Sequence, residues 1–394
     1  MSKHRNTPEL RFPEFKDEWK NNELGKLLSI ISGHSPSYYS EGSEYPLYKV
    51  NDLNNNSKFQ DYSDLYVEKK HTPLNKKVII FPKRGAAILL NKIRIINTPG
   101  YIDTNLMGLE FNDVNDTEFY YYAILREGLY RIADTSTIPQ INNKHILPYK
   151  IYSPSYIEKN KLGNFFSKLD RQIELEEQKL AKLEEQKKGY MQQIFSRQFL
   201  FENEKGDTDY SWRNFKIKDI FSKIESGNRL PKTNLVEGNI PYVIAQTTNN
   251  GVFMHISEDT LDYHKNKLKL FKKGSITISI DNPEAMFIQE MDFFTSNVMR
   301  VIHNENLKRG SHIFIMESLK KLTQSYNWSV KFSGPIIMDS TVKFPVYNDN
   351  KVNWNVVNKI GDFFNTFEIR INRQSDKIKL LEERKKGLLQ KMFV

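Results

Sequence analysis

The sequence contains no cysteine. This absence excludes disulfide bridges, cysteine-ligated zinc, iron–sulfur clusters and a thiol nucleophile, and it is typical of a reducing compartment. Long apolar runs are also missing, because the longest, Ala86–Leu90, is far too short to span a bilayer. The opening residues, Met1-Ser-Lys-His-Arg-Asn-Thr-Pro8, lack the apolar core of a signal peptide. We therefore expect a cytoplasmic chain with no membrane partner.

Catalytic signatures are absent as well. The sequence has no Gly-rich dinucleotide fingerprint, Walker loop, His-Glu-x-x-His motif or nucleophile elbow, and its 8 histidines show no metal-ligand spacing. The segment Asp281-Asn-Pro-Glu284 shares an Asn-Pro pair with an adenine methyltransferase loop, but it lacks the proline and the aromatic residue that would follow. We interpret this segment as a turn. The sequence thus predicts no catalytic residue, no metal and no cofactor.

The composition describes a globular chain with a modest basic excess. It has 394 residues, 39% hydrophobic and 27% charged, and its 58 Lys and Arg against 48 Asp and Glu give a net charge of +10. The length predicts two or three cooperative units. A basic balance is compatible with a nucleic-acid partner, but the excess is spread over both halves of the chain and forms no polybasic tail.

An internal repeat sets the architecture. Gly163-Asn-Phe-Phe recurs as Gly361-Asp-Phe-Phe, and Leu183-Glu-Glu-Gln-Lys-Lys-Gly recurs as Leu381-Glu-Glu-Arg-Lys-Lys-Gly, both at an offset of 198 positions. The apolar residues before Gly33 run parallel to those before Gly227. Elsewhere the two blocks diverge, which indicates one scaffold used twice with different surface content.

The repeated segments, Leu162–Phe195 and Ile360–Phe393, carry apolar residues at alternating spacings of three and four, the pattern of coiled-coil helices. Both seams are polar at the same two places, and a parallel pairing would set Lys187 against Lys385. An antiparallel pairing separates these two lysines. The seam positions that we expect to pair the helices are Phe166, Leu169, Ile173, Leu180, Leu183, Phe364, Phe367, Ile371, Ile378 and Leu381.

The blocks between the helices have mixed patterns. The runs Lys77–Phe81, Ser275–Ile280 and Asn297–Ile302 indicate strands. Glu118–Arg131 and Ile313–Tyr326 indicate helices late in each block, where a helix covers one face of a small sheet. The predicted fold class is α+β: two pseudo-repeated domains of mixed helix and strand, separated by two long helices that form an antiparallel coiled coil.

Together with the opening Pro8-Glu-Leu-Arg-Phe-Pro-Glu-Phe15, the repeated helices and the divergent blocks make the whole chain resemble the specificity subunit of a type I restriction-modification system. The resemblance implies the following division of the chain: target recognition domain 1 (1–157), conserved spacer helix 1 (158–198), target recognition domain 2 (199–354) and conserved spacer helix 2 (355–394).

The same resemblance implies a non-catalytic subunit. Each recognition domain would read one half of a split, asymmetric site in double-stranded DNA, and the helices would space the domains and dock two methyltransferase subunits, with two restriction (translocase) subunits joining for cleavage. Helices of about 33 residues span roughly 50 Å, and one DNA turn is about 34 Å long. Two blocks at opposite ends of such helices could therefore reach major grooves about a turn or more apart.

Loops rich in amide, hydroxyl and basic side chains supply the donors and acceptors that read base edges. The candidates in the first block are Ser35, Tyr38, Lys49, Asn51, Lys83, Arg84, Gln140, Asn142 and Asn143. Those in the second block are Asn228, Arg229, Lys232, Gln246, Thr247, Asn249 and Asn250. Two alternatives stay open: a stand-alone duplicated DNA-binding protein, and a cytosolic scaffold whose blocks bind proteins or sugars.

Overall fold

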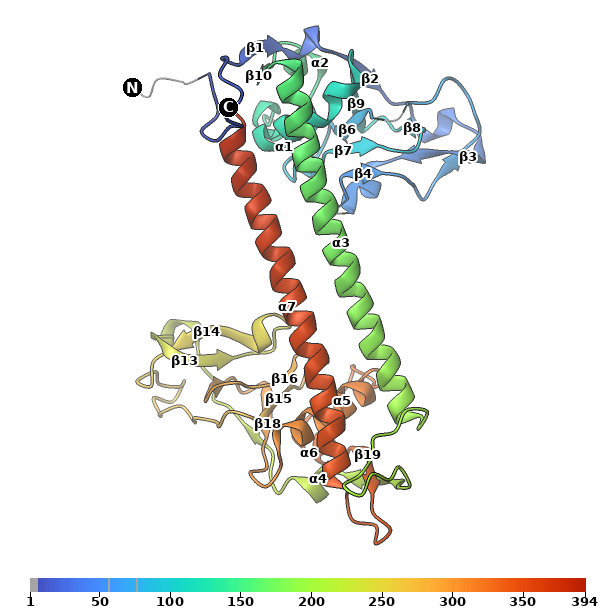
Figure 1. Cartoon of the computed structure of the whole chain (residues 1–394). Coiled ribbons are helices and arrows are strands. Elements are labelled where there is room, and N and C mark those ends of the chain that lie inside the picture. The colour runs from blue at the N-terminus through green and yellow to red at the C-terminus, as the bar shows by residue number, and fades with distance from the viewer. Residues whose placement is uncertain (1–5, 56, 76) are drawn as a thin grey trace. The chain divides into compact units, whose positions relative to one another are not determined.

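The structure is a computed structural model and describes residues 6–55, 57–75 and 77–394, so part of the opening segment, Met1–Arg5, lies outside the described residues. The chain divides into two compact units (Figure 1). Unit 1 comprises the residues up to Lys179 together with Gln374–Val394, and unit 2 comprises Leu180–Arg373. In the part of the chain that the structure describes, no helix is both long enough and apolar enough to cross a bilayer.

In the residues that the structure describes, unit 1 contains three small sheets. A five-stranded sheet has the order β2-β9-β6-β7-β4, a three-stranded sheet has the order β5-β3-β8, and β1 pairs with β10. The strands are β1 (Lys20–Glu23), β2 (Leu28–Ser32), β3 (Glu41–Tyr48), β4 (Phe59–Gln60), β5 (Tyr66–Val67), β6 (Ile79–Pro82), β7 (Arg94–Ile96), β8 (Tyr101–Ile102), β9 (Leu106–Phe111) and β10 (Lys150–Ser153). The helices are α1 (Thr117–Glu127) and α2 (Asn143–Ile146).

Unit 2 repeats this plan. Its sheets have the orders β12-β18-β15-β16, β14-β13-β17 and β11-β19. The strands are β11 (Ser211–Lys216), β12 (Glu225–Ser226), β13 (Glu237–Val243), β14 (Val252–Ile256), β15 (Ile276–Ser279), β16 (Met286–Ile288), β17 (Phe294–Thr295), β18 (Met299–Ile302) and β19 (Thr341–Val346). The helices are α4 (Ile217–Ile220), α5 (Arg309–Thr323) and α6 (Gly334–Asp339). The predicted strands and helices of both blocks are confirmed.

The weak sequence match around Gly33 and Gly227 has a structural cause. A Cβ atom on Gly33 would lie 2.0 Å from the carbonyl oxygen of Asp103, and one on Gly227 would lie 1.8 Å from the carbonyl oxygen of Thr295. In unit 1 the residues after β2 lie directly against the end of β8, which pairs in parallel with β3. In unit 2 the residues after β12 lie directly against the end of β17, which pairs in parallel with β13. Only glycine allows two backbones to approach this closely.

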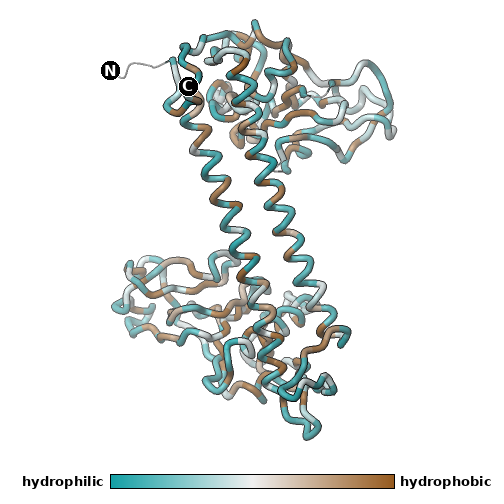
Figure 2. The backbone as a smooth tube through the Cα atoms, viewed as in Figure 1, coloured by the Kyte–Doolittle hydropathy of each residue, from teal (hydrophilic) through white to brown (hydrophobic). Residues whose placement is uncertain are grey.

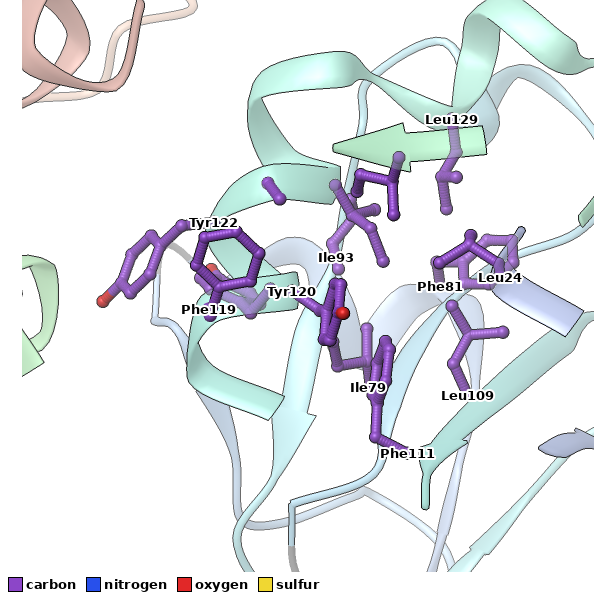
Figure 3. Packing of buried hydrophobic residues seen from close by; sticks show 14 of the residues in the cluster. Leu24, Ile79, Phe81, Ile93, Leu109, Phe111, Phe119, Tyr120, Tyr122 and Leu129 are labelled. Carbon is purple, nitrogen blue, oxygen red and sulfur yellow. The ribbon is translucent and has the colours of Figure 1, made fainter. Parts of the chain in front are cut away.

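The core of unit 1 lies between α1 and the five-stranded sheet. Figure 3 shows Phe119 and Tyr120 of α1 beside Ile79 and Phe111 of the sheet. The rings of Tyr120 and Phe111 stack with centroids 4.5 Å apart. In unit 2, α5 plays the same part, and Phe314 is buried among strand residues such as Ile276.

Two long helices, α3 (Tyr156–Phe195) and α7 (Trp354–Met392), carry the repeated seams. Figure 2 shows apolar and polar residues alternating along both. Both helices begin six residues earlier than the repeat predicts. At the start of α7, the side chain of the buried Asn353 accepts a hydrogen bond from the amide of Val356 (3.2 Å), which is the geometry of a helix cap.

The predicted antiparallel pairing of α3 and α7 is confirmed within each unit. In unit 1, Lys385 forms an ion pair with Asp170 (2.5 Å), and Gln374 donates to Glu176 (2.7 Å). In unit 2, Lys187 forms an ion pair with Glu368, and the ring of Tyr190 packs on that of Phe363 with centroids 5.2 Å apart. Residues further along α3 thus contact residues earlier in α7, as in an antiparallel pair. Lys187 and Lys385 each pair with a carboxylate instead of facing one another.

The predicted seam residues differ in burial. Those that are nearly inaccessible are Phe166, Leu169, Phe364, Phe367, Ile378 and Leu381. Those that are half-buried are Ile173, Leu180, Leu183 and Ile371. Phe166 and Phe364 also belong to the cores of unit 1 and unit 2, because the recognition blocks pack against the same helix face.

We expect Gly361→Ala to destabilise unit 2. Its Cβ would lie 1.7 Å from the carbonyl oxygen of Gly310, so α7 and α5 would be forced apart, at a cost of about 1–3 kcal/mol. Thermal unfolding measures the loss. Gly387→Ala is the matched control on the same helix. Nothing lies within 4 Å of its added methyl group, so it should gain about 0.5–1 kcal/mol. Equal effects of the two substitutions would contradict the close helix contact.

Unit 2 should also lose stability in mild acid because of His312 on α5. Burial lowers the pKa of this side chain to about 4, below the ordinary 6.5. The unfolded chain therefore binds a proton before the folded chain does, and stability falls between about pH 6.5 and pH 4, by about 3 kcal/mol in full. Urea unfolding across this window should show a flatter pH dependence for His312→Gln than for the unmodified chain. His255→Gln, at an exposed site, should leave the slope unchanged.

Candidate nucleic-acid interface

Several strands of unit 1 end at one surface. After β2, the amide of His34 donates to the carbonyl of Ile102 at the end of β8 (3.2 Å). The amide of Asp103 donates to the carbonyl of Tyr48 at the end of β3 (3.0 Å). These bonds hold together the segments that follow β2, β3 and β8. The predicted contacts that come next in these segments are Ser35 and Lys49.

The segment after β6 joins the same place. The amide of Lys83 donates to the carbonyl of Asn105 (2.8 Å), and the carbonyl of Lys83 accepts from the amide of Ile141 (2.9 Å). The next residue, Arg84, forms an isolated antiparallel bridge with Gln140. We call this region the strand-end surface of unit 1; its residues are His34, Ser35, Lys49, Lys83, Arg84, Asp103 and Gln140.

Two adjacent cations dominate the charge of this surface. Burial and the neighbouring Arg84 lower the pKa of Lys83, while Asp103 opposes the shift. Asp103 is buried close to Lys83, and its two carboxylate oxygens accept from the backbone amide (2.9 Å) and the side chain (3.2 Å) of Asn105. The adjacent cations Lys83 and Arg84 suit a ligand that presents negative oxygens, as the phosphates of DNA do.

Tyr38 adds an aromatic face to this surface. Its ring is 44% exposed and stacks on the ring of His34 with centroids 4.6 Å apart. The ammonium group of Lys70 lies 5.4 Å from the same ring. Ser35, beside it, has its hydroxyl 2.9 Å from that of Ser37.

The three predicted asparagines of unit 1 lie beside this surface. Asn51 is exposed in the short helix η3 (Val50–Asn54), just after Lys49. Asn142 caps α2, and its amide donates to the ring nitrogen Nδ1 of His145 (3.1 Å). Asn143 is the first residue of that helix. A turn or cap role therefore accounts for Asn142 and Asn143 without a ligand.

Unit 2 repeats the backbone frame with different side chains. Three equivalent amide–carbonyl bonds, each of 3.1 Å, join Asn228 to Thr295, Ser296 to Val243 and Ile280 to Val298. A fourth joins the amide of Phe332 to the carbonyl of Ile280 (2.9 Å) and corresponds to the bond between Ile141 and Lys83. The strand-end surface of unit 2 is thus built like that of unit 1.

One predicted group of unit 2 lies on the segment after β12. The side chain of Asn228 donates to Asp262 (3.0 Å) and accepts from the amide of Lys269 (3.0 Å), so both ends of its amide tie this segment to residues far along the chain. The guanidinium of Arg229 lies 5.2 Å from the exposed ring of Tyr263. Lys232 is exposed at the start of the short helix η7 (Lys232–Asn234).

The other predicted group follows β13 in one tight turn. The side chain of Gln246 donates to the carbonyl of Val252 (2.8 Å) and so closes the turn. Asn249 and Asn250 both have φ of 51°, in the left-handed region that asparagine tolerates. Thr247 is exposed between them and Gln246. Gln246 and Asn249, whose side chain also donates to the carbonyl of Val252 (3.1 Å), thus shape the turn, while Thr247 and Asn250 are exposed.

Two residues of unit 2 were missed by sequence analysis. Asp281 follows Ile280 as Arg84 follows Lys83, and Lys331 precedes Phe332 as Gln140 precedes Ile141. The shared backbone frame therefore places Asp281 and Lys331 where unit 1 has the bridged residues Arg84 and Gln140. Asp281 begins the Asp-Asn-Pro-Glu segment, and the predicted turn is confirmed, with the amide of Glu284 donating to Asn282 (3.1 Å). Only an alignment of the two diverged blocks could have identified the match.

Within the described ranges, no group of three or more acidic or histidine side chains has the geometry of a metal site. The molecule instead presents two repeated α+β units, each with a surface of basic, amide and hydroxyl groups at equivalent strand ends. This arrangement defines a class of duplicated proteins with one equivalent polar surface on each of two α+β units.

Comparison with known proteins assigns the family. The model of the type I restriction modification DNA specificity domain matches twice, at residues 16–185 and 210–378. The chain therefore belongs to the type I restriction-modification DNA specificity domain family.

Individual relatives are distant. The specificity subunit of the type II restriction enzyme BgcI from Heyndrickxia coagulans is 28% identical over 144 residues, which cover 36% of this chain and 40% of that protein. The chain thus spans about two fifths of the length of this curated relative. The crystal structure of a type I restriction-modification S subunit from M. genitalium has a TM-score of 0.64 at 15% identity, over 98% of this chain and 99% of that one. A chain from a study of complex assembly and conformational transition of the type I restriction-modification system has a TM-score of 0.54 at 12% identity, over 95% and 97%. These likenesses show a shared fold.

Proposed function

We propose that the chain is the non-catalytic specificity subunit of a type I restriction-modification complex in the cytoplasm. Each unit reads one half of a split, asymmetric site in double-stranded DNA, and α3 and α7 set the gap and dock the methyltransferase subunits. The observation that carries the proposal is the shared backbone frame, which holds different polar side chains in the two units. A fixed frame with exchangeable side chains suits two readers of different sequences.

The further parts of the proposal follow from the family. Two methyltransferase subunits, one for each half of the site, use the paired helices as a platform, and two restriction subunits join them for cleavage. The recognition domains are proposed as 1–157 and 199–354 and the spacer helices as 158–198 and 355–394. The predicted loop residues, from Ser35 to Asn250, are proposed as DNA contacts.

The test is affinity purification from the native host, followed by methylation assays. We expect a methyltransferase and a large ATP-dependent translocase to copurify in stoichiometric amounts, and labelled methyl groups to enter DNA only when the methyltransferase is present. Methyl transfer by the pure chain would refute the non-catalytic assignment. Sequence-specific DNA binding by a chain that copurifies with neither subunit would favour the stand-alone DNA-binding protein, and absence of DNA binding would favour the scaffold.

A further inference from the structure

The strand-end surfaces of the two units differ most sharply at one matched pair of positions. In unit 1, the carbonyl of Lys83 accepts from the amide of Ile141, and the neighbouring Arg84 and Gln140 form a bridge. In unit 2, the carbonyl of Ile280 accepts from the amide of Phe332. The residues at the corresponding neighbouring positions are Asp281 and Lys331.

These positions carry opposite chemistry in the two units. Unit 1 presents a guanidinium and a neutral amide, whereas unit 2 presents a carboxylate and an ammonium group. The carboxylate of Asp281 lies 3.3 Å from the ammonium of Lys331, and their side chains are 44% and 68% exposed. An exposed ion pair contributes little to stability, so it can open toward a ligand at small cost.

The loop that carries Asp281 is held in place by other groups. The hydroxyl of Ser279 accepts hydrogen bonds from the amides of Asp281 (3.2 Å) and Asn282 (3.1 Å). The backbone position of Asp281 therefore does not depend on its own side chain. The carboxylate is free to be exchanged during evolution without loss of the loop.

We propose that this pair of positions reads base edges in both units, and that it makes the two half-sites differ in which base of a G·C pair faces the equivalent position, guanine for Arg84 and cytosine for Asp281. Arg84 donates to O6 and N7 of a guanine in the half-site of unit 1. In unit 2, Asp281 accepts from the N4 amino group of a cytosine, and Lys331 donates to the guanine of the same base pair. The chemistry follows the hydrogen-bonding pattern of the major groove. The inference rests on the proposed function and adds the positions and the base-pair class.

The test transplants the pair in the full-length chain, assembled with its methyltransferase subunits, and maps methylation over a randomised DNA library. With Asp281→Arg and Lys331→Gln together, the preference for C·G should be lost at one position in the half-site of unit 2. Discrimination there should change by about 10- to 100-fold, while the other half-site stays unchanged. Arg84→Asp with Gln140→Lys should change the base preference at one position in the half-site of unit 1 and leave the half-site of unit 2 unchanged.

A matched control makes the same charge change elsewhere in unit 2. Asp349 and Lys351 form an exposed ion pair (3.0 Å) in the turn between β19 and α7. Asp349→Arg with Lys351→Gln should keep the original preference. Unchanged discrimination in the transplants, a uniform loss at all sequences, or an equal shift in the control would overturn the inference while the proposed function stands. If the unmodified complex methylates without sequence preference, the proposed function fails and the inference with it.

Discussion

Deleting residues Leu388–Val394 should unfold the sheet of unit 1. Leu389, Met392 and Phe393 are buried in its core, although they lie far from the rest of that core in sequence. Phe393 packs on Trp19 and Phe119 with ring centroids 6.1 and 5.4 Å apart. Removing one such side chain costs about 2–5 kcal/mol, so losing all three matches the about 5–15 kcal/mol that stabilises a typical domain.

Hydrogen exchange measured by peptide would test this expectation. Protection in β6 and β9 of unit 1 should be lost, whereas β15 and β18 of unit 2 should keep theirs. Leu380→Ala is the control, because its side chain on α7 is 65% exposed and its loss should change stability by less than about 0.5 kcal/mol. Full protection of β6 in the truncated chain would show that the C-terminal turn of α7 does not complete this core.

Exchanging residues 212–344 for the matching block of a relative should change one half of the recognised DNA sequence and leave the other half intact. Both junctions lie on a single two-stranded sheet, because Trp212 in β11 pairs with Pro345, and Arg213 pairs with Phe344 in β19. The exchanged block thus keeps its own strand-end surface, while α3 and α7 stay unchanged. Methylation mapping of the assembled complex gives the readout.

The reciprocal exchange serves as the control. Residues 21–151 lie between the equivalent junctions of unit 1, where Asn22 in β1 pairs with Ile151 in β10. This exchange should change only the other half-site. A change of both half-sites by either exchange would show that the two units do not read DNA independently.

The long helices could be predicted from sequence because their signal is local. Apolar residues recur along one face for several turns, and the matched polar positions favoured an antiparallel order. What the pattern could not show is that Phe166 and Phe364 serve the domain cores as well as the helix pair. Which element packs against a helix face depends on contacts from distant parts of the chain.

The strand-end surfaces were only partly predictable for the same reason. Lys83, Arg84 and Gln140 were chosen by side-chain type, and backbone bonds across distant segments bring them together. Asn228 and Gln246 have the right chemistry, but the side-chain amide of Asn228 bonds to Asp262 in a distant segment, and that of Gln246 bonds within its own turn. Asp281 was assigned to a turn, which is correct, yet its equivalence to Arg84 of unit 1 follows only from the repeated backbone frame.

The position of Phe393 in the core of unit 1 also affects the order of folding during synthesis. The ribosome makes the strands and α1 of unit 1 first, and we expect that core to stay open until Leu389, Met392 and Phe393 emerge. The core of unit 2, in contrast, is built from one continuous stretch between Ile194 and Phe364. Unit 2 can therefore close while unit 1 still exposes apolar surface, which reverses the usual order from the N-terminus. A growing chain would need protection of Trp19 and Phe119 for most of its translation.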